Sequence, residues 1–379
     1  MRVSTPQDNL SKGLSIVSRA VGSRSNLPVL SNVLIATDNG RLRLAATNLN
    51  DLGIVSWVAA SVEEDGAITV PARTLNDLVN TLSPERVDLE VAVRTNTLNL
   101  NCGAMTAQIK GIDAQEFPIM PEPTDEDQYL PVPAQLLRET IKMVAFAAAR
   151  QDSRPVLTGV LMEYDGQSLT MAAADGFRLA VREMPLAAES SENFSLVVPA
   201  KTLSELERIG ANEDEDVYIV LPKDRSQQVL FHMNNVDVST QLLGEEFPNF
   251  RQIVPQETTT RVILDTASLL QACKRADIFA REANHTIQVH IQPQEGMAGV
   301  VRVSATSAET GENEGFLDAT IEGDDLSISF NVRYVIDVLN VIQSESVEIL
   351  TSRPDKPGII RPLGDSTYTY VIMPMYTGR

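Results

Sequence analysis

The residue types that most often carry out catalysis or bind metals are few in this chain. It has three histidines, His232, His285 and His290, and two cysteines, Cys102 and Cys273. His285 and His290 lie across a predicted loop and strand, without the spacing of a known metal site, so a surface or packing role is favoured over ligation. Cys102 ends a predicted strand and Cys273 lies on an apolar helix face, which favours small core residues over nucleophiles.

Asp175, directly before Gly176, could be read as a catalytic carboxylate on a turn. The equivalent places in the other two repeats described below are Asn48-Leu49 and Ser307-Ala308, so a turn-forming role is favoured. The sequence also has no glycine-rich phosphate loop of the Walker type. We therefore expect no enzyme activity, with no catalytic residue, no metal site and no cofactor.

The distribution of charge is the stronger chemical signal. The chain has 31 lysines and arginines against 51 acidic residues, a formal net charge of −20, which argues against a nucleic-acid partner. The basic residues nevertheless outnumber the acidic ones on the first predicted helix of each repeat, and the acidic excess lies elsewhere. This is either an ordinary solvated helix face or one surface that attracts a polyanion while the others repel it.

The chain repeats itself at the length of a domain. The stretch Val70-Pro71-Ala72-Arg73-Thr74-Leu75 recurs as Val198-Pro199-Ala200-Lys201-Thr202-Leu203, and more loosely at residues 330–335. A period of about 130 residues is the size of a whole domain, so we expect one domain written three times. Proline-containing, acidic linkers separate the predicted domains, which span residues 1–122, 129–254 and 260–379.

Each repeat shows a helix, several strands, a second helix and several more strands. Leu10, Leu14 and Val17 fall at helical spacing, and Asp38-Asn39-Gly40 is typical of a tight hairpin turn. Separate helices and hairpin-linked strands indicate an α+β fold, with two helices covering one face of an antiparallel sheet in each repeat. The predicted helices include residues 8–22, 72–82, 134–151, 266–282 and 332–343.

Apolar runs and cysteine content bear on the cellular compartment of the protein. No apolar run approaches the roughly 20 residues needed to cross a bilayer, and the first residues show no apolar signal core. Two cysteines do not make a disulfide framework in a chain of this length. We therefore expect a cytoplasmic protein of bacterial type, with aliphatic cores because only 5% of its residues are aromatic.

Several further motifs, in this order, complete a resemblance. These are Leu-Pro-Val-Leu from Leu27, Ala-Asp-Gly-Phe-Arg-Leu-Ala from Ala174, Glu-Phe-Pro at Glu116 and Glu246, and Tyr-Val-Ile-Met-Pro-Met from Tyr370. With the three repeats, they resemble the bacterial DNA polymerase III β subunit family, the sliding clamps, over the whole chain. The resemblance implies a non-catalytic processivity factor of DNA replication. Head-to-tail homodimers of three-domain protomers would close as a ring around duplex DNA, with helices inside and sheets outside.

The resemblance also implies sequence-independent contacts with double-stranded DNA. It further implies a pocket between repeats two and three that takes short linear peptides from the replicative polymerase, the clamp loader and other proteins. The DNA-facing residues would be Arg24, Arg73, Gln151 and Lys201, to which helical facing adds Lys12, Arg138 and Lys142. The pocket would be formed by Leu157, Gly176, Phe177, Arg178, Leu179, Pro248, Ile253, Val371, Met373, Pro374 and Met375.

The seam of the implied dimer would place Ile278 and Phe279 of one protomer near Ile109 of the other, with Lys110 nearby. The family often has an acidic strip that meets arginines here. The acids are present as Glu309, Glu312 and Glu314, but the stretch from Cys102 to Thr106 has no arginine. We therefore expect apolar packing and strand pairing to hold the seam more than ion pairs.

Other departures concern the pocket and the DNA. Phe177 stands where relatives often have histidine, which should make the pocket rim more apolar. Arg154-Pro155-Val156 replaces tyrosines that touch DNA in some relatives, and Tyr376–Arg379 follow the Met-Pro-Met motif.

Two other classes of function remain open from the residues alone. One is a triplicated enzyme or small-ligand binder with a site between repeats. The other is an adaptor that binds peptides without encircling DNA. The lack of clustered histidines, cysteines or paired acids disfavours the enzyme.

Overall fold

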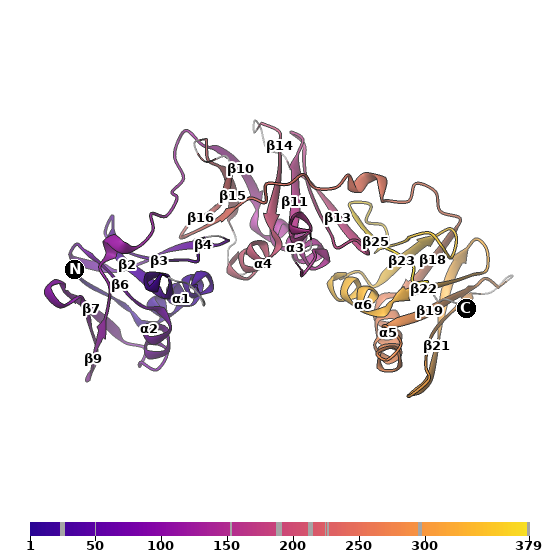
Figure 1. Ribbon diagram of the computed structural model, residues 1–379, viewed down its shortest axis with the longest axis horizontal. Coiled ribbons are helices and arrows are strands. Elements are labelled where there is room, and N and C mark those ends of the chain that lie inside the picture. Colours follow the sequence, from indigo (N-terminus) through magenta and orange to yellow (C-terminus); the bar gives the residue numbers. More distant parts are fainter. Residues whose placement is uncertain are drawn as a thin grey trace. The chain divides into compact units, whose positions relative to one another are not determined.

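A computed structural model describes residues 1–22, 27–49, 51–151, 154–186, 192–210, 215–223, 225, 227–294 and 298–376. The chain forms two compact units, and Figure 1 labels their helices and strands. The first unit comprises residues 1–138, 190–192 and 205–242, and the second comprises residues 139–189, 193–204 and 243–379. Helices α3 (Ala134–Val144) and α4 (Ala200–Ile209) contribute residues to both units.

The first unit contains two antiparallel sheets, covered by helices α1 (Gln7–Val17) and α2 (Ala72–Val79). The strand orders are β5-β1-β7-β8-β9 and β10-β15-β16-β17-β4-β3-β2-β6. The strands are β1 (Arg2–Pro6), β2 (Asn32–Asp38), β3 (Arg41–Thr47), β4 (Gly53–Val58), β5 (Ser61–Glu64), β6 (Ala67–Pro71), β7 (Arg86–Ala92), β8 (Thr97–Cys102), β9 (Met105–Lys110), β10 (Gln128–Pro133), β15 (Asp216–Leu221), β16 (Gln228–Met233) and β17 (Val236–Gln241).

The second unit contains a twelve-stranded sheet, with helices α5 (Thr266–Ala280) and α6 (Val332–Val341) packed against each other. The strand order is β14-β11-β12-β13-β25-β24-β23-β18-β21-β20-β19-β22. The strands are β11 (Gly159–Tyr164), β12 (Ser168–Ala174), β13 (Arg178–Pro185), β14 (Phe194–Pro199), β18 (Thr260–Asp265), β19 (Thr286–Gln292), β20 (Gly299–Ser307), β21 (Gly311–Glu322), β22 (Leu326–Asn331), β23 (Ser346–Thr351), β24 (Gly358–Pro362) and β25 (Tyr368–Ile372).

Neighbouring repeats share sheets within each unit. In the first unit β17 of the middle repeat pairs with β4 of the first, and in the second unit β25 of the third repeat pairs with β13 of the middle one. Both joins are antiparallel, with Val236 opposite Ser56 and Val371 opposite Leu179. Backbone hydrogen bonds therefore continue across each predicted domain boundary, and the linkers do not leave the repeats free of each other.

The local patterns explain these elements. Leu10, Leu14 and Val17 are fully buried, so the predicted apolar face of α1 is the one that packs on the sheet. Asn39 and Gly40 have φ angles of 50° and 76°, the left-handed backbone that a two-residue hairpin turn requires. The α+β fold class with antiparallel sheets is therefore confirmed.

No helix within the described ranges is long and apolar enough to span a membrane.

Several predicted boundaries are wrong: the helices expected over residues 8–22 and 72–82 end at Val17 and Val79. The helix expected over residues 134–151 ends at Val144 and is followed by a short 3-10 turn, Ala145–Ala147. Tertiary contacts explain this end: the Phe146 carbonyl accepts a hydrogen bond from Arg178, and the Phe146 ring stacks on Tyr370 at 5.8 Å. Residues 53–64 form two strands, β4 and β5, rather than one.

Candidate functional site

The helices of the first unit expose basic side chains opposite their buried faces. Lys12 of α1 and Arg73 of α2 are both exposed, and Leu10 and Leu75 anchor the other faces of these helices in the core. The Arg73 side chain is 95% exposed and lies 3.6 Å from Asp77, so this pair is solvated. Arg138, in α3, is half-buried. These cations therefore lie on the helices that cover the sheets, which we call the helical layer.

The second unit shows the same arrangement. Lys142 of α3 and Lys201 of α4 are exposed, as is Gln151 beyond the end of α3. The first turn of α6 adds an exposed Arg333, the basic residue of the third repeat motif. Arg24, the remaining candidate, lies outside the described residues. Exposed cations thus recur on helices of all three repeats in a chain of net charge −20.

Candidate pocket residues meet where β13 pairs with β25. Leu157, Leu179 and Val371 belong to one buried apolar cluster, against which Phe247 and Val254 pack. Three apolar residues beside this cluster are exposed: Phe177 by 61%, Ile253 by 40% and Met373 by 39%. The Met373 N–H donates to the Phe177 carbonyl at 2.9 Å.

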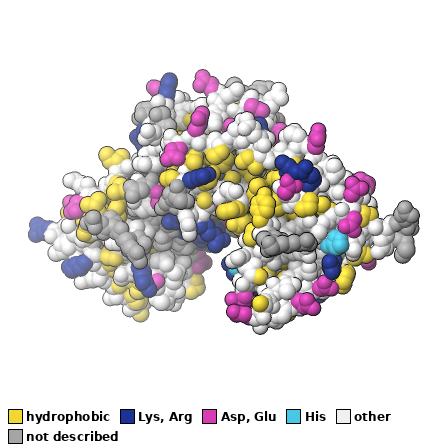
Figure 2. Space-filling model, turned by 45° about the vertical axis from the view of Figure 1, so that its right-hand side comes forward, with side chains coloured by type: hydrophobic (Ala, Val, Ile, Leu, Met, Phe, Trp, Pro, Cys, Tyr) yellow, Lys and Arg dark blue, Asp and Glu magenta, His cyan; other side chains and the backbone are white. Residues whose placement is uncertain are grey.

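Gly176 and Pro248 are also exposed, and Pro374 and Met375 are half-buried. Figure 2 shows hydrophobic side chains gathered among charged ones on one face of the molecule. The arrangement suits an apolar ligand side chain better than a charged one.

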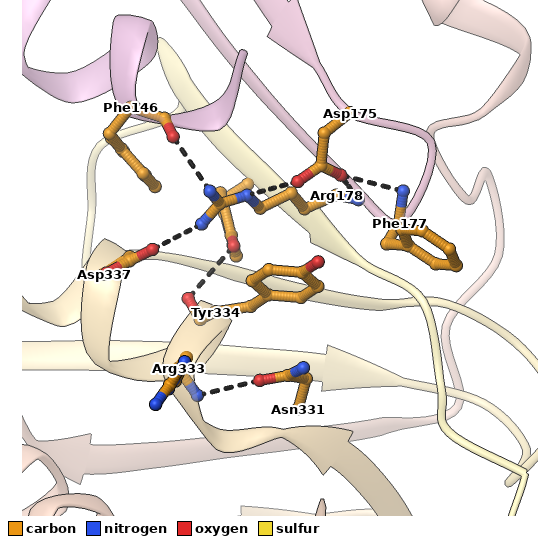
Figure 3. Close-up of polar contacts among 9 residues, drawn as sticks. Phe146, Asp175, Phe177, Arg178, Asn331, Arg333, Tyr334 and Asp337 are labelled. Carbon is orange, nitrogen blue, oxygen red and sulfur yellow. Dashed lines mark hydrogen bonds and ion pairs between the residues drawn. The ribbon is translucent and has the colours of Figure 1, made fainter. Parts of the chain in front are cut away.

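Arg178 takes a different position from the other pocket candidates. Its side chain is only 4% exposed, and its guanidinium lies 2.9 Å from an Asp175 oxygen and 2.6 Å from an Asp337 oxygen (Figure 3). It also donates to the Phe146 carbonyl at 2.9 Å and lies 4.4 Å from the centre of the Tyr334 ring. Burial alone lowers the pKa of Arg178, but the hydrogen bonds and charges of Tyr370, Asp337 and Asp175 outweigh burial and raise it. Arg178 therefore links the middle repeat to α6 while remaining charged.

The Asp175 turn explains how Phe177 is presented. One Asp175 carboxylate oxygen accepts the N–H groups of Phe177 and Arg178 at 2.9 and 3.1 Å, and Gly176 has a φ of 93°. The turn-forming role expected for Asp175 is confirmed. In the first repeat, the Asn48 side chain likewise accepts the N–H groups of Asp51 and Leu52, and Leu49 has a φ of 69°.

The contacts of the histidines and the burial of the cysteines indicate structural roles. His232, His285 and His290 lie 2.6, 3.0 and 3.0 Å from carboxylate oxygens of aspartates. Cys102 and Cys273 are buried, as expected, and burial raises the pKa of the Cys273 thiol to about 12. A neutral, buried thiol is a poor nucleophile. Among the described residues, no three His, Cys, Asp or Glu side chains are grouped so as to hold a metal ion.

The candidate seam residues lie on separate elements. Ile278 of α5 is 57% exposed and Phe279 is half-buried. Ile109 is only 6% exposed, so it has little surface to offer a second protomer. The neighbouring Lys110 is exposed, and its ammonium donates to the Thr97 hydroxyl at 3.0 Å.

Two sheet edges near these residues are open. Strand β9 is the last strand of its sheet, and residues 311–319 of β21 pair on one side only, with β20, among the described residues. Phe316, which the sequence reasoning missed, is 64% exposed on this part of β21. Strand alternation places Phe316 on the same face as Glu312 and Glu314, a pattern that could have identified it.

Comparisons with known proteins assign the family. Models of the DNA polymerase III beta subunit match the chain in three parts: the N-terminal domain over residues 1–121, the central domain over 131–249 and the C-terminal domain over 251–376. A beta sliding clamp from Synechococcus elongatus is 34% identical over 377 residues, covering 99% of each chain.

Comparison with solved structures points to the same family. The structure is similar to a DNA polymerase sliding clamp from Bacillus subtilis, with a TM-score of 0.93, 29% identity and full coverage of both chains. It is also similar to a sliding clamp from Pseudomonas aeruginosa bound to griselimycin, with a TM-score of 0.91, 29% identity and 99% coverage of both chains. The chain therefore belongs to the DNA polymerase III beta subunit family, the beta sliding clamps.

Proposed function

We propose that this protein is a DNA sliding clamp that encircles duplex DNA and tethers the replicative polymerase and other partners, which makes synthesis processive. The observation that carries this proposal is the repeated helical layer with exposed cations in a chain of net charge −20. A surface of this kind attracts a polyanion on one side, while the acidic remainder repels it. Contacts with phosphates carry no sequence information, so the clamp can slide.

The ring forms from two protomers joined head to tail. A heterologous interface closes into a ring when its rotation is that of a closed symmetry. The open edges of β9 and of β21 are suited to antiparallel or parallel pairing between protomers, since an unpaired strand edge is a template for another strand. Ile278, Phe279 and Phe316 supply exposed apolar surface for the same seam.

Ion pairs contribute little to this seam. Glu314 of the acidic strip already pairs with Arg302 of its own chain at 2.9 Å. No arginine lies in the stretch 102–106 of β8 and β9. Removal of apolar area from water is then the main source of affinity, and dimerisation should depend weakly on salt.

Partners bind through short peptides at the join of β13 and β25. The buried cluster of Leu157, Leu179 and Val371 forms the floor, and the exposed Phe177, Ile253 and Met373 form the rim. Methionine side chains adapt to ligands of different shape, which suits one pocket that serves several partners. The protein itself is a non-catalytic binding protein: its histidines are paired with aspartates and its Cys273 thiol has a raised pKa.

The experiment that tests this function is retention on DNA after loading. Labelled protein is loaded by a bacterial clamp loader onto nicked circular DNA and separated from free protein by gel filtration. A ring held by topology stays on the circle and leaves within minutes once a restriction enzyme linearises the DNA. Equal retention on circular and linear DNA would exclude encirclement and favour an ordinary DNA-binding or adaptor protein.

A further inference from the structure

A groove of about 720 Å³ continues from the rim of the peptide pocket within the second unit. One wall is the segment after β17 that contains Ile253, Val254 and Pro255, and the other is the turn between β23 and β24 that ends at Pro357. Met373 also lines the groove, so the groove shares Ile253 and Met373 with the proposed peptide pocket. A ligand that occupies the pocket can therefore continue along the groove without leaving the protein surface.

The turn of the second wall presents a cation. Arg353 and Lys356 both line the groove. Arg353 is already held by Asp355 through two contacts of 3.0 and 2.8 Å, so its charge is matched within the turn. The Lys356 ammonium, in contrast, has no hydrogen bond or ion pair with any described residue, while its backbone N–H is fixed to the Arg353 carbonyl at 3.1 Å. Lys356 is thus an exposed cation without an ion pair on this turn, and the nearest acid, Asp355, already pairs with Arg353.

The opposite wall carries one acid, Glu257, which is exposed and lines the groove. Glu257 does not form an ion pair with Lys356, and the two side chains stand on different walls. Glu257 therefore disfavours an acidic ligand on its own side of the groove and biases the ligand's charge toward Lys356. The apolar residues of the two walls suit the rest of an extended chain.

We propose that this groove is an additional subsite for partner peptides, which binds an acidic residue flanking the apolar segment through Lys356. The proposal rests on the proposed function, since it requires that the neighbouring pocket take peptides. Lys356 is then a specificity-determining residue. An exposed ion pair adds modest affinity but discriminates well between partners, because the wrong charge is repelled. The expected gain for an acidic flank is about two- to fivefold in Kd at low salt.

Fluorescence anisotropy with the full-length protein tests the proposal. The probes are synthetic peptides with a Leu-Phe core. Two of them carry three aspartates, one before and one after the core, and two matched peptides carry three asparagines at the same places. One aspartate-flanked peptide should bind about two- to fivefold more tightly than its asparagine twin, and 0.5 M salt should abolish the difference. Lys356→Met should remove the advantage, and Glu257→Gln should enlarge it.

Controls separate the subsite from the pocket. Lys223→Met, on the turn after β15, should leave the aspartate advantage unchanged, and Lys356→Glu should reverse the preference toward a lysine-flanked peptide. Equal Kd values for aspartate and asparagine peptides, with the core still bound in a Met373-dependent way, would overturn the subsite alone. Loss of all core binding in the unchanged protein would overturn the peptide pocket and the subsite together.

Discussion

The Arg178 guanidinium and the Asp337 carboxylate of α6 lie 2.6 Å apart, and this contact joins the middle repeat to the third. Arg178 follows the turn that presents Phe177, while Asp337 lies one helical turn after the exposed Arg333. The Tyr370 hydroxyl reinforces the link by donating to the Tyr334 carbonyl at 3.0 Å. The proposed pocket rim and a helix with an exposed cation therefore share one partly buried polar cluster.

Breaking this cluster should weaken both stability and peptide binding. Arg178→Met leaves the partly exposed carboxylates of Asp175 and Asp337 without their cation, so we expect the free energy of unfolding to fall by about 1–3 kcal/mol, as for a lost hydrogen bond to a charged group. Asp337→Asn should cost less, because Asp175 still pairs with Arg178. Urea unfolding measures these changes. Arg86→Met, which removes the exposed pair with Asp88, is the control and should change stability by less than about 1 kcal/mol.

Neutralising the helix cations should weaken DNA contact without sequence preference. Lys12→Ala, Lys142→Ala and Lys201→Ala should each reduce the slope of log affinity against log salt by up to about one. Binding of the protein to short duplexes at several salt concentrations measures the slope. Lys223→Ala serves as the control. An unchanged slope in all three helix variants would show that these cations do not face the duplex.

The interface between the two protomers should be held mainly by apolar contacts. Phe316→Asp and Ile278→Asp place an unpaired charge in the interface, so we expect the dimer Kd to rise at least about 100-fold. Glu312→Gln should leave the Kd within about threefold. Sedimentation velocity between 0.05 and about 1 M salt measures both effects. A Kd of the unchanged protein that rises steeply with salt would contradict apolar closure.

Acid should destabilise the second unit through Glu348. This carboxylate is 4% exposed, lies 2.7 Å from Arg261 and also contacts Arg361. Burial raises the pKa of Glu348, but hydrogen bonds and charges from Arg261 and Arg361 outweigh burial and lower it. A lowered pKa stabilises the fold above the unfolded value of about 4.3, and the contribution is lost as pH falls through the folded value.

Glu348→Gln should therefore reduce the free energy of unfolding by about 1–3 kcal/mol at pH 7. The difference from the unchanged protein should shrink as the pH falls below about 4. Urea titrations between pH 3 and pH 7 measure it. A difference that stays constant over this range would show that the pKa of Glu348 is the same in the folded and the unfolded protein, which would contradict a lowered pKa.

The repeats made much of the fold predictable. The hydrophobic period of Leu10, Leu14 and Val17, the Asn39-Gly40 turn and the recurring Arg73 and Lys201 motif each depend on local chain geometry. Local patterns of this kind give the type and order of elements reliably. The early end of α3 was not predictable, because it depends on Arg178 and Tyr370, which lie far away in the sequence.

The candidate site was predictable only in part, for the same reason. Apolar residues such as Leu179 and Val371 could be placed through the family resemblance. The burial of Arg178 could not, because a sequence does not show that Asp337 lies 159 residues away but within hydrogen-bond reach. The free ammonium of Lys356 was not predictable either, because it depends on Asp355 pairing with Arg353 instead.

The most direct test of the central claim is photo-crosslinking from single positions of the loaded clamp to DNA. A photoreactive phenylalanine analogue replaces Lys142 on α3 or, in a second protein, the exposed Tyr218 on β15. If the helical layer lines the ring, the Lys142 position should crosslink to duplex DNA and the Tyr218 position should not. Crosslinks from Tyr218 in the absence of crosslinks from Lys142 would contradict a ring with its helices inside.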